Sequence, residues 1–260
     1  MPPQFTIHPT AIVHHDTVIG DGVEISAYAV IGPGVTLGGG VWVGHHAVVE
    51  CNTTLGAGCR VFHSAVLGVP PQDLKYRGEE TRLEVGERTI IREFASLHRG
   101  TVATGVTKIG SDALLMAYTH VAHDCEIGDR VIMANGVQLG GHVHIGDWAI
   151  IGGLTPVHQF CRIGAHAMVG GGLRASQDVA PFMTAADDPM RLLGINSVGL
   201  RRRGFSPESI AALKRAHRLL CRSHLNTDQA VTAIREQLPP LPEIQQLLAF
   251  LSSSQRGFVK

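Results

Sequence analysis

The feature that most constrains the fold is a six-residue repeat of aliphatic side chains. Within residues 7–67, 85–97 and 109–169, an aliphatic residue or methionine returns at every sixth position. In the first of these stretches, a small or β-branched residue follows four positions later. A period of six fits neither the 3.6-residue helix nor a plain alternating strand. The repeat therefore indicates short strands joined by tight corners.

Three repeats would close one triangular coil of a parallel β-helix, with the aliphatic side chains inside and glycine easing the corners. Coils stack about 4.8 Å apart, so residues one coil apart lie above one another. Each coil contacts only its neighbours, so both ends need caps. We expect a mainly β protein, with the β-helix in residues 1–190 and loops leaving the coil near 68–84 and 100–108. A loop as long as the one near 68–84 inside a regular solenoid is usually functional.

The chain changes character near residue 190. All but two of its 31 glycines come before residue 200. Beyond that point, capping residues, prolines at helix starts and apolar faces predict helices over 206–223, 226–238 and 242–252. We expect residues 191–260 to form a small α-helical domain that caps the coil or helps to build a site between subunits.

Composition excludes several classes of protein. The 260 residues carry 22 basic and 22 acidic side chains, so no global field attracts nucleic acid or an anionic membrane. No apolar run reaches the roughly 20 residues of a transmembrane helix, and the first residues do not form a secretory signal. Five cysteines without a C-x-x-C pair favour reduced packing residues over disulfides or a thiolate metal site. We therefore expect a cytoplasmic protein without a nucleic-acid partner or a transmembrane segment.

Histidines are the residues most suited to chemistry in this chain. One coil beyond His123 lies Gly141, and a further coil leads to Gln159, so these positions and their neighbours His142 and His158 should share one edge. A single histidine on a coil is usually solvated or packed, but a stacked column can form the wall of a cleft. The ordinary histidine pKa of about 6.5 suits a general base that acts on an alcohol.

Two neighbours of this column are candidates for supporting roles. Asp124 is a candidate orienting partner for His123, although adjacent residues in a strand point to opposite faces. Gly141 lacks a side chain, so its N–H is accessible to a developing oxyanion.

Several segments together resemble one family over essentially the whole chain. In order, they are QDLKY at 72–76, IRE at 91–93, LHRGT at 97–101, HVAHDC at 120–125, VHQFC at 157–161 and GLRRRGFS at 199–206. The pattern is similar to that of the cytoplasmic UDP-N-acetylglucosamine O-acyltransferases of lipid A biosynthesis, which are hexapeptide-repeat proteins. The resemblance implies a left-handed β-helix with a helical tail, a homotrimer and no cofactor or metal. It also implies transfer of an (R)-3-hydroxyacyl group from acyl carrier protein to the glucosamine 3-hydroxyl of UDP-N-acetylglucosamine.

The resemblance also implies roles for individual residues. His123 would be the general base and Gly141 the oxyanion donor, and the 68–84 loop would reach a neighbouring subunit. Residues that would contact the sugar, the nucleotide or the acyl donor are Gln72, Asp73, Lys75, His98, His120, His142, His158, Gln159, Asn196, Arg202 and Arg203. Where some members carry an acid two residues after Asn196, this chain has Val198, which puts one nucleotide contact in doubt.

Two of these assignments have simpler alternatives. The arginines at 201–203 can be a solvated cluster, or they can meet a diphosphate or an acidic carrier protein. The resemblance also implies that Gly171 limits the length of the acyl chain. Because glycine has no side chain to block the acyl chain, a long donor near 3-hydroxymyristoyl is expected. The alternative is that Gly171 only permits a tight corner.

Three other functions remain open from the sequence. A zinc carbonic anhydrase on the same fold would need His120, His123 and His142 to converge across a subunit interface. A noncatalytic scaffold explains the repeat but not the histidine column. A sister N-acyltransferase would carry an extra N-terminal domain, whereas the repeat here begins at Ile7.

Overall fold

Short parallel strands build three sheets that form the faces of a left-handed, triangular β-helix. The computed structural model describes residues 5–260. Sheet A contains β1 (Thr6–Ile7), β4 (Glu24–Ile25), β7 (Trp42–Val43), β10 (Arg60–Val61), β13 (Ile90–Ile91), β16 (Leu114–Leu115), β19 (Ile132–Met133), β22 (Ile150–Ile151), β25 (Met168–Val169), β26 (Met183–Ala186) and β27 (Arg191–Ile195). Sheet B contains β2 (Ile12–Val13), β5 (Val30–Ile31), β8 (Val48–Val49), β11 (Val66–Val69), β14 (Ser96–His98), β17 (His120–Val121), β20 (Gln138–Leu139) and β23 (Pro156–Val157). Sheet C contains β3 (Val18–Ile19), β6 (Thr36–Leu37), β9 (Thr53–Leu55), β12 (Arg82–Val85), β15 (Val106–Ile109), β18 (Glu126–Ile127), β21 (His144–Ile145) and β24 (Arg162–Ile163).

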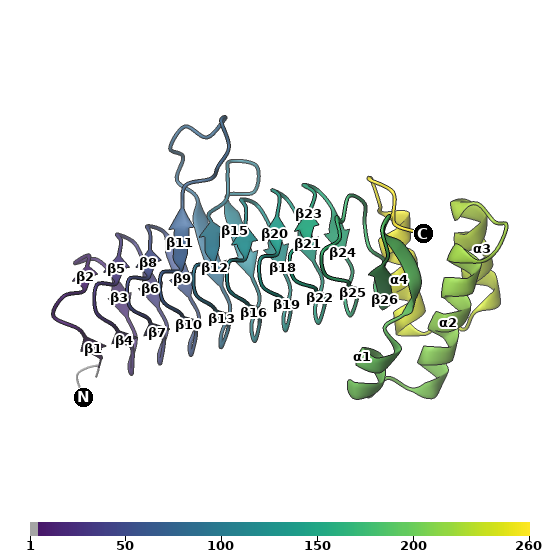
Figure 1. Cartoon of the computed structure of the whole chain (residues 1–260), viewed down its shortest axis with the longest axis horizontal. Helices are drawn as coiled ribbons and strands as arrows, with labels where there is room; N and C mark the ends of the chain where they lie inside the picture. Colours follow the sequence, from purple (N-terminus) through teal and green to yellow (C-terminus); the bar gives the residue numbers. More distant parts are fainter. Residues whose placement is uncertain (1–4) are drawn as a thin grey trace.

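The register of the strands confirms the predicted coil. Glu24 pairs with Trp42 and Ile25 with Val43, so strands one coil apart lie side by side (Figure 1). The aliphatic residue of each repeat points inward, and those of the central coils are almost completely buried, as at Ile31. Sequential strands of one coil belong to different sheets, so the core is a single apolar column along the helix axis.

Glycine eases some of the corners, as at Gly22 (φ 73°), but not all of them. The third residue after the inward aliphatic side chain adopts the left-handed conformation, and large residues often occupy it, as at Tyr28 (φ 59°) and Phe94 (φ 58°). The glycine directly after the aliphatic residue is needed for another reason. At Gly20, a Cβ would lie 2.7 Å from the backbone nitrogen of Gly39 in the next coil. Close stacking of coils therefore requires that glycine, not a turn conformation.

Two loops leave the coil where the repeat pauses, as predicted. One joins β11 to β12 and the other joins β14 to β15, and both project from the same side of the β-helix (Figure 1). The first begins at Gly68 (φ 76°), where the pairing of β11 with β14 shifts register. A Cβ at Gly68 would collide with Thr53 Oγ1, so only glycine fits this exit from the coil.

The coil ends in a strand pair and four helices. β27 pairs antiparallel with β26, so sheet A continues past the expected boundary at residue 190 as far as Ile195. The helices are α1 (Ser197–Arg202), α2 (Pro207–Cys221), α3 (Thr227–Gln237) and α4 (Pro242–Ser252), and the last three match the predicted helices. Within residues 5–260, no helix is long and apolar enough to cross a membrane.

Side-chain caps explain where α1, α2 and α3 begin. The side chain of Ser206 accepts a hydrogen bond at the start of α2, and Asn226 forms a capping box with Gln229 at the start of α3. Helix α1 was not predicted, because it is only six residues long and contains Gly199. Asn196 caps it.

Candidate active site

Histidines from successive coils line the edge between sheets B and C, as the repeat predicts. The His142 N–H donates to the His123 carbonyl (3.0 Å), and the Phe160 N–H donates to the Gly141 carbonyl (3.1 Å). The rings of His123 and His142 are 5.3 Å apart, and His142 stacks on Phe160 at 4.6 Å. The His158–Gln159 pair occupies the next coil of this edge, where the His158 ring contacts the Gln159 carbonyl (3.0 Å). We call His123, Gly141, His142, His158 and Gln159 the histidine column.

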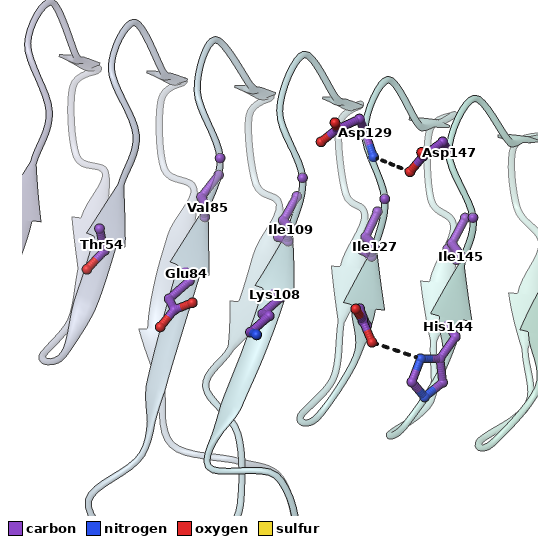
Figure 2. Close-up of a pocket in the computed structure, with 15 residues that line it drawn as sticks. Thr54, Glu84, Val85, Lys108, Ile109, Ile127, Asp129, His144, Ile145 and Asp147 are labelled. Atoms are coloured by element: carbon purple, nitrogen blue, oxygen red, sulfur yellow. Dashed lines mark hydrogen bonds and ion pairs between the residues drawn. The ribbon is translucent and has the colours of Figure 1, made fainter. Parts of the chain in front are cut away.

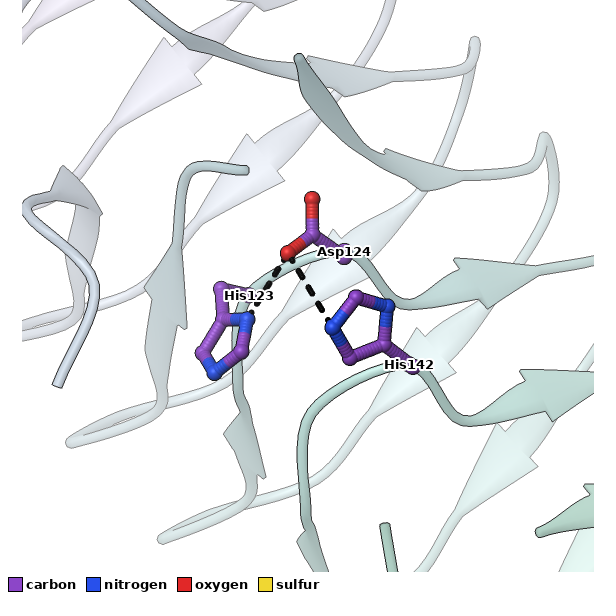
Figure 3. A group of neighbouring side chains, drawn as sticks. All are labelled: His123, Asp124 and His142. Carbon is purple, nitrogen blue, oxygen red and sulfur yellow. Dashed lines mark hydrogen bonds and ion pairs between the residues drawn. The ribbon is translucent and has the colours of Figure 1, made fainter. Parts of the chain in front are cut away.

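The carboxylate of Asp124 pairs with the ring of His123. The distance from His123 Nδ1 to Asp124 Oδ2 is 2.8 Å (Figure 3). Strand alternation would have separated these neighbours, but Asp124 is the corner residue and has a φ of 58°. The left-handed corner turns the carboxylate back toward the histidine. His142 Nε2 lies 3.6 Å from the same oxygen.

The second loop holds the Asp124 carboxylate in place. Thr101 donates to it from its N–H (2.9 Å) and from its hydroxyl (2.6 Å), and the Thr104 hydroxyl donates as well. Burial of Asp124 raises its pKa, but the hydrogen bonds from Thr101, Thr104 and His123 outweigh burial and lower it to about 2. The carboxylate is therefore charged at neutral pH and fully buried.

A charged acceptor beside Nδ1 decides which ring nitrogen of His123 is free. Asp124 accepts the Nδ1–H, so the lone pair of neutral His123 lies on Nε2. The His123 side chain is 16% exposed, which leaves access from solvent. This arrangement, a base oriented by a buried carboxylate, is suited to take a proton from a hydroxyl group.

Gly141 lies directly against the His123 ring. A Cβ at this position would be 2.6 Å from His123 Cε1 and 2.8 Å from Nε2, so any side chain would displace the imidazole. Within residues 5–260, the Gly141 N–H has no acceptor. The same backbone group can therefore donate to an oxyanion formed near Nε2.

A second pair of histidines lies on the outer face of sheet B. The rings of His98 and His120 are 5.0 Å apart, and His120 Nδ1 lies 2.8 Å from Ser96 Oγ. Burial lowers the pKa of His120 to about 4, with a smaller contribution from His98. Burial also lowers the pKa of His98, against the hydrogen bond to the Pro70 carbonyl. Both rings are therefore neutral near pH 7 and can hydrogen-bond a substrate without charge.

The first loop brings a carboxylate toward the histidine column. This loop joins β11 of sheet B to β12 of sheet C, so it leaves the coil at the same edge as the histidine column. Burial lowers the pKa of His142, and the negative charges of Asp124 and Asp73 partly oppose this shift. Asp73 also accepts the Lys75 N–H (2.9 Å), which forms a turn at the loop tip. Gln72 and Lys75 are exposed beside it.

Four of the predicted site residues lie on other edges of the coil. Gly171 follows β25 at the edge between sheets A and B, where a Cβ would be 3.0 Å from the Gly153 carbonyl oxygen. Arg202 is exposed at the end of α1. Arg203 and Asn196 reach the edge between sheets C and A. A single chain therefore does not bring these four to His123.

The contacts at that third edge centre on His166. Arg203 Nη1 lies 3.2 Å from His166 Nδ1, and the guanidinium stacks over Trp148 at 4.9 Å. Burial, with a smaller contribution from the charge of Arg203, lowers the pKa of His166 to about 4. Asn196 is buried and donates to the His166 carbonyl (3.0 Å) while its oxygen caps α1. Asn196 therefore also has a structural role that the sequence did not reveal.

One hollow in residues 5–260, about 740 Å³, lies away from the histidine column. It lies on the outer face of sheet C, between side chains such as Glu84, Lys108 and Glu126 (Figure 2). None of the predicted site residues lines it. The hollow is open, and the His144 Nδ1 and Glu126 Oε2 atoms that line it are 3.3 Å apart. The histidine column, in contrast, combines the buried Asp124 carboxylate, the His123 ring and the Gly141 N–H, so we take it as the candidate active site.

One group in residues 5–260 has the residue types of a metal site. It consists of His123, Asp124 and His142, whose ligand atoms lie within 4.8 Å of one another. The zinc carbonic anhydrase alternative would add His120, which does not belong to this group. Both oxygens of Asp124 already accept hydrogen bonds from Thr101 and from other donors, so the carboxylate is committed to the protein.

Sequence reasoning missed the residues that support the histidines. Thr101 and Thr104 come from the second loop, and Ser96 comes from the coil below His120. A usable signal was present, because the repeat breaks directly before the coil of His123 and the break is rich in threonine.

Comparisons with known proteins identify the family of this chain. The chain matches the family model "Udp N-acetylglucosamine O-acyltransferase; Domain 2" over residues 178–259 and "Bacterial transferase hexapeptide (six repeats)" over residues 107–141. It is 49% identical to the acyl-(acyl-carrier-protein)–UDP-N-acetylglucosamine O-acyltransferase of Herminiimonas arsenicoxydans, over 98% of this chain and 99% of that protein. The protein of the same name from Thiobacillus denitrificans is 50% identical, with 98% and 99% covered.

Solved structures give the same result. LpxA from Acinetobacter baumannii superposes with a TM-score of 0.95 at 45% identity, over 98% of this chain and 99% of that one. The UDP-N-acetylglucosamine acyltransferase of Francisella novicida superposes with a TM-score of 0.95 at 35% identity, with 98% and 94% covered. These comparisons give no support to a carbonic anhydrase. The chain is an acyltransferase and belongs to the acyl-(acyl-carrier-protein)–UDP-N-acetylglucosamine O-acyltransferase family.

Proposed function

We propose that this enzyme transfers an (R)-3-hydroxyacyl group from acyl carrier protein to the 3-hydroxyl of UDP-N-acetylglucosamine, the first step of lipid A biosynthesis. The names of the relatives supply the two substrates. The observation that carries the proposal is the His123–Asp124 pair beside the free N–H of Gly141. Together these groups provide a base and an oxyanion donor at one point, as acyl transfer requires.

The proposed reaction uses His123 twice. Its Nε2 takes the proton of the sugar hydroxyl as the oxygen attacks the thioester carbonyl. The Gly141 N–H donates to the oxyanion of the tetrahedral intermediate. When the carbon–sulfur bond breaks, the proton passes from Nε2 to the thiolate of the carrier. An ester and a free carrier thiol result, and no redox change occurs. Asp124 orients the ring and stabilises its charged form throughout.

The histidines at 98 and 120 would bind the sugar and neighbouring groups. Both have pKa values lowered by burial, so they act as neutral hydrogen-bonding groups. Asp73 and Lys75 would approach the sugar from the first loop, and Gln72 lies beside them. His142, His158 and Gln159 would extend the contact surface along the edge.

We propose a cytoplasmic homotrimer in which a neighbour completes the site. Asn196, Arg202, Arg203 and Gly171 lie on edges other than that of His123, so a second copy would have to bring them there. The outer face of sheet A supports this assembly, because it carries a row of half-buried or exposed apolar side chains, namely Ile90, Leu114, Ile132, Ile150 and Met168. The matching row of sheet C is mostly charged. A continuous apolar row on a solenoid favours association.

The length of the acyl group would depend on Gly171. This residue is exposed and offers no side chain to block an acyl chain. We propose a preference for a long donor, near 3-hydroxymyristoyl.

The direct test is to incubate the purified protein with UDP-N-acetylglucosamine and a panel of 3-hydroxyacyl carrier proteins. Mass spectrometry of the nucleotide product would give both the reaction and the preferred length. We expect one acyl group added at the 3-hydroxyl. A chain that acylates no donor–acceptor pair in the panel would refute the proposal. Light scattering of the same sample would test the trimer.

A further inference from the structure

Arg99 is a buried cation that the proposed reaction does not use. It follows β14 and is only 8% exposed. Within residues 5–260, no carboxylate forms an ion pair with it. Removing a guanidinium from water without a counter-charge costs free energy, so the other contacts of Arg99 must offset the cost of its burial.

Those contacts join the coil to the first loop. Arg99 Nη1 donates to the Gly68 carbonyl (3.1 Å) and to Cys51 Sγ (2.6 Å). Arg99 Nη2 donates to the Tyr76 hydroxyl (3.0 Å), and the guanidinium lies 5.9 Å from the centre of the Tyr76 ring. The Arg99 side chain therefore contacts both Gly68, where the loop leaves the coil, and Tyr76 within the loop.

Within residues 5–260, no other hydrogen bond ties residues 71–80 to the coil. The loop stands clear of the coil between β11 and β12 (Figure 1). Within the described residues, the hydrogen bonds of residues 71–80 stay inside that segment, except the one from Arg99 to Tyr76. The Tyr76 hydroxyl in turn donates to the Glu79 carbonyl (2.8 Å), so it also closes the loop on itself.

We infer that Arg99 is a positioning residue that holds the loop, through Tyr76, so that Asp73 and Lys75 face the histidine column. The inference rests on the proposed function for the roles of Asp73 and Lys75. The guanidinium suits this task because its planar fork reaches two acceptors at a fixed angle. A lysine ammonium at the same place cannot span the Gly68 carbonyl and the Tyr76 hydroxyl together.

Tyr76→Phe tests the link with little risk to the fold, because it removes one hydroxyl and keeps the ring. We expect the KM for UDP-N-acetylglucosamine to rise about tenfold, corresponding to about 1.4 kcal/mol, with kcat within about threefold of the wild-type value. Hydrogen–deuterium exchange of residues 71–80 in the substrate-free protein should become faster. Arg99→Lys should give the same two changes. The double variant should be no worse than Arg99→Lys alone, because both changes break one link.

The matched control is Tyr28→Phe, at an exposed corner where the hydroxyl has no hydrogen bond within residues 5–260. It should leave KM, kcat and exchange unchanged. Unchanged exchange of residues 71–80 in Tyr76→Phe would overturn the link itself. Faster exchange with an unchanged KM would overturn the positioning role. A wild-type protein that does not acylate UDP-N-acetylglucosamine would instead overturn the proposed function, and with it the substrate role of the loop, whatever the exchange shows.

Discussion

Replacing Asp124 with asparagine should slow catalysis strongly, because it would move the ring proton of His123 from Nδ1 to Nε2. The two carboxylate oxygens receive donors from Thr101, Thr104 and His123. Asparagine offers one acceptor and one donor end. The Thr101 N–H is fixed in the backbone, so the amide oxygen should face it and the NH₂ group should face His123 Nδ1. Nδ1 must then accept a hydrogen bond, which places the ring proton on Nε2 and removes the lone pair that would act as base.

The expected loss follows from the role of a general base, which contributes about 10²- to 10⁴-fold. We expect kcat of Asp124→Asn to fall by that factor, with KM changed by less than about threefold because the ring keeps its place. Turnover would be measured by mass spectrometry of acylated nucleotide, and the fold by circular dichroism. The matched control is Asp129→Asn at another corner, where, among the contacts of residues 5–260, the carboxylate accepts only the Ser111 N–H (2.7 Å). A folded Asp124→Asn enzyme with more than about a tenth of wild-type kcat would refute this reasoning.

Three further predictions test other parts of the site. His123→Ala should fold normally and lose about 10²- to 10⁴-fold in activity, whereas His120→Ala should lose less; an equal or larger loss in His120→Ala would contradict the assignment of His123 as the base. Gly171→Met should shift the preferred donor from near fourteen carbons toward about ten, since each unburied CH₂ loses about 0.8 kcal/mol, and an unchanged preference in the folded variant would exclude a role of Gly171 in limiting acyl length. Because the pKa of Asp124 is lowered from 3.8 to about 2 in the folded protein, its charge adds about 2 kcal/mol to stability above pH 4, and this is lost as the pH falls toward 2. The gap in urea stability between wild type and Asp124→Asn should therefore narrow between pH 7 and pH 3, and a constant gap would contradict the lowered pKa.

The sequence by itself determined the coil. A period of six is carried by local steric and hydrophobic requirements that repeat in every turn, so spacing alone predicted the parallel strands, the two loops and the stacking of His123, Gly141 and Gln159. Helix caps are equally local, which is why the starts at Ser206 and Asn226 could be predicted. Counting residues in steps of one coil therefore predicted which candidate residues lie on the same edge.

Tertiary structure decided how those residues interact. The pairing of His123 with Asp124 depends on the left-handed corner at Asp124, which strand alternation does not predict. The low pKa of Asp124 depends on Thr101 and Thr104, which a loop brings from another coil. Likewise, the link from Arg99 to Tyr76 joins residues 23 positions apart across a loop with no repeat to set its course. Side-chain direction and loop path arise from contacts between distant residues, so no local pattern in the sequence encodes them.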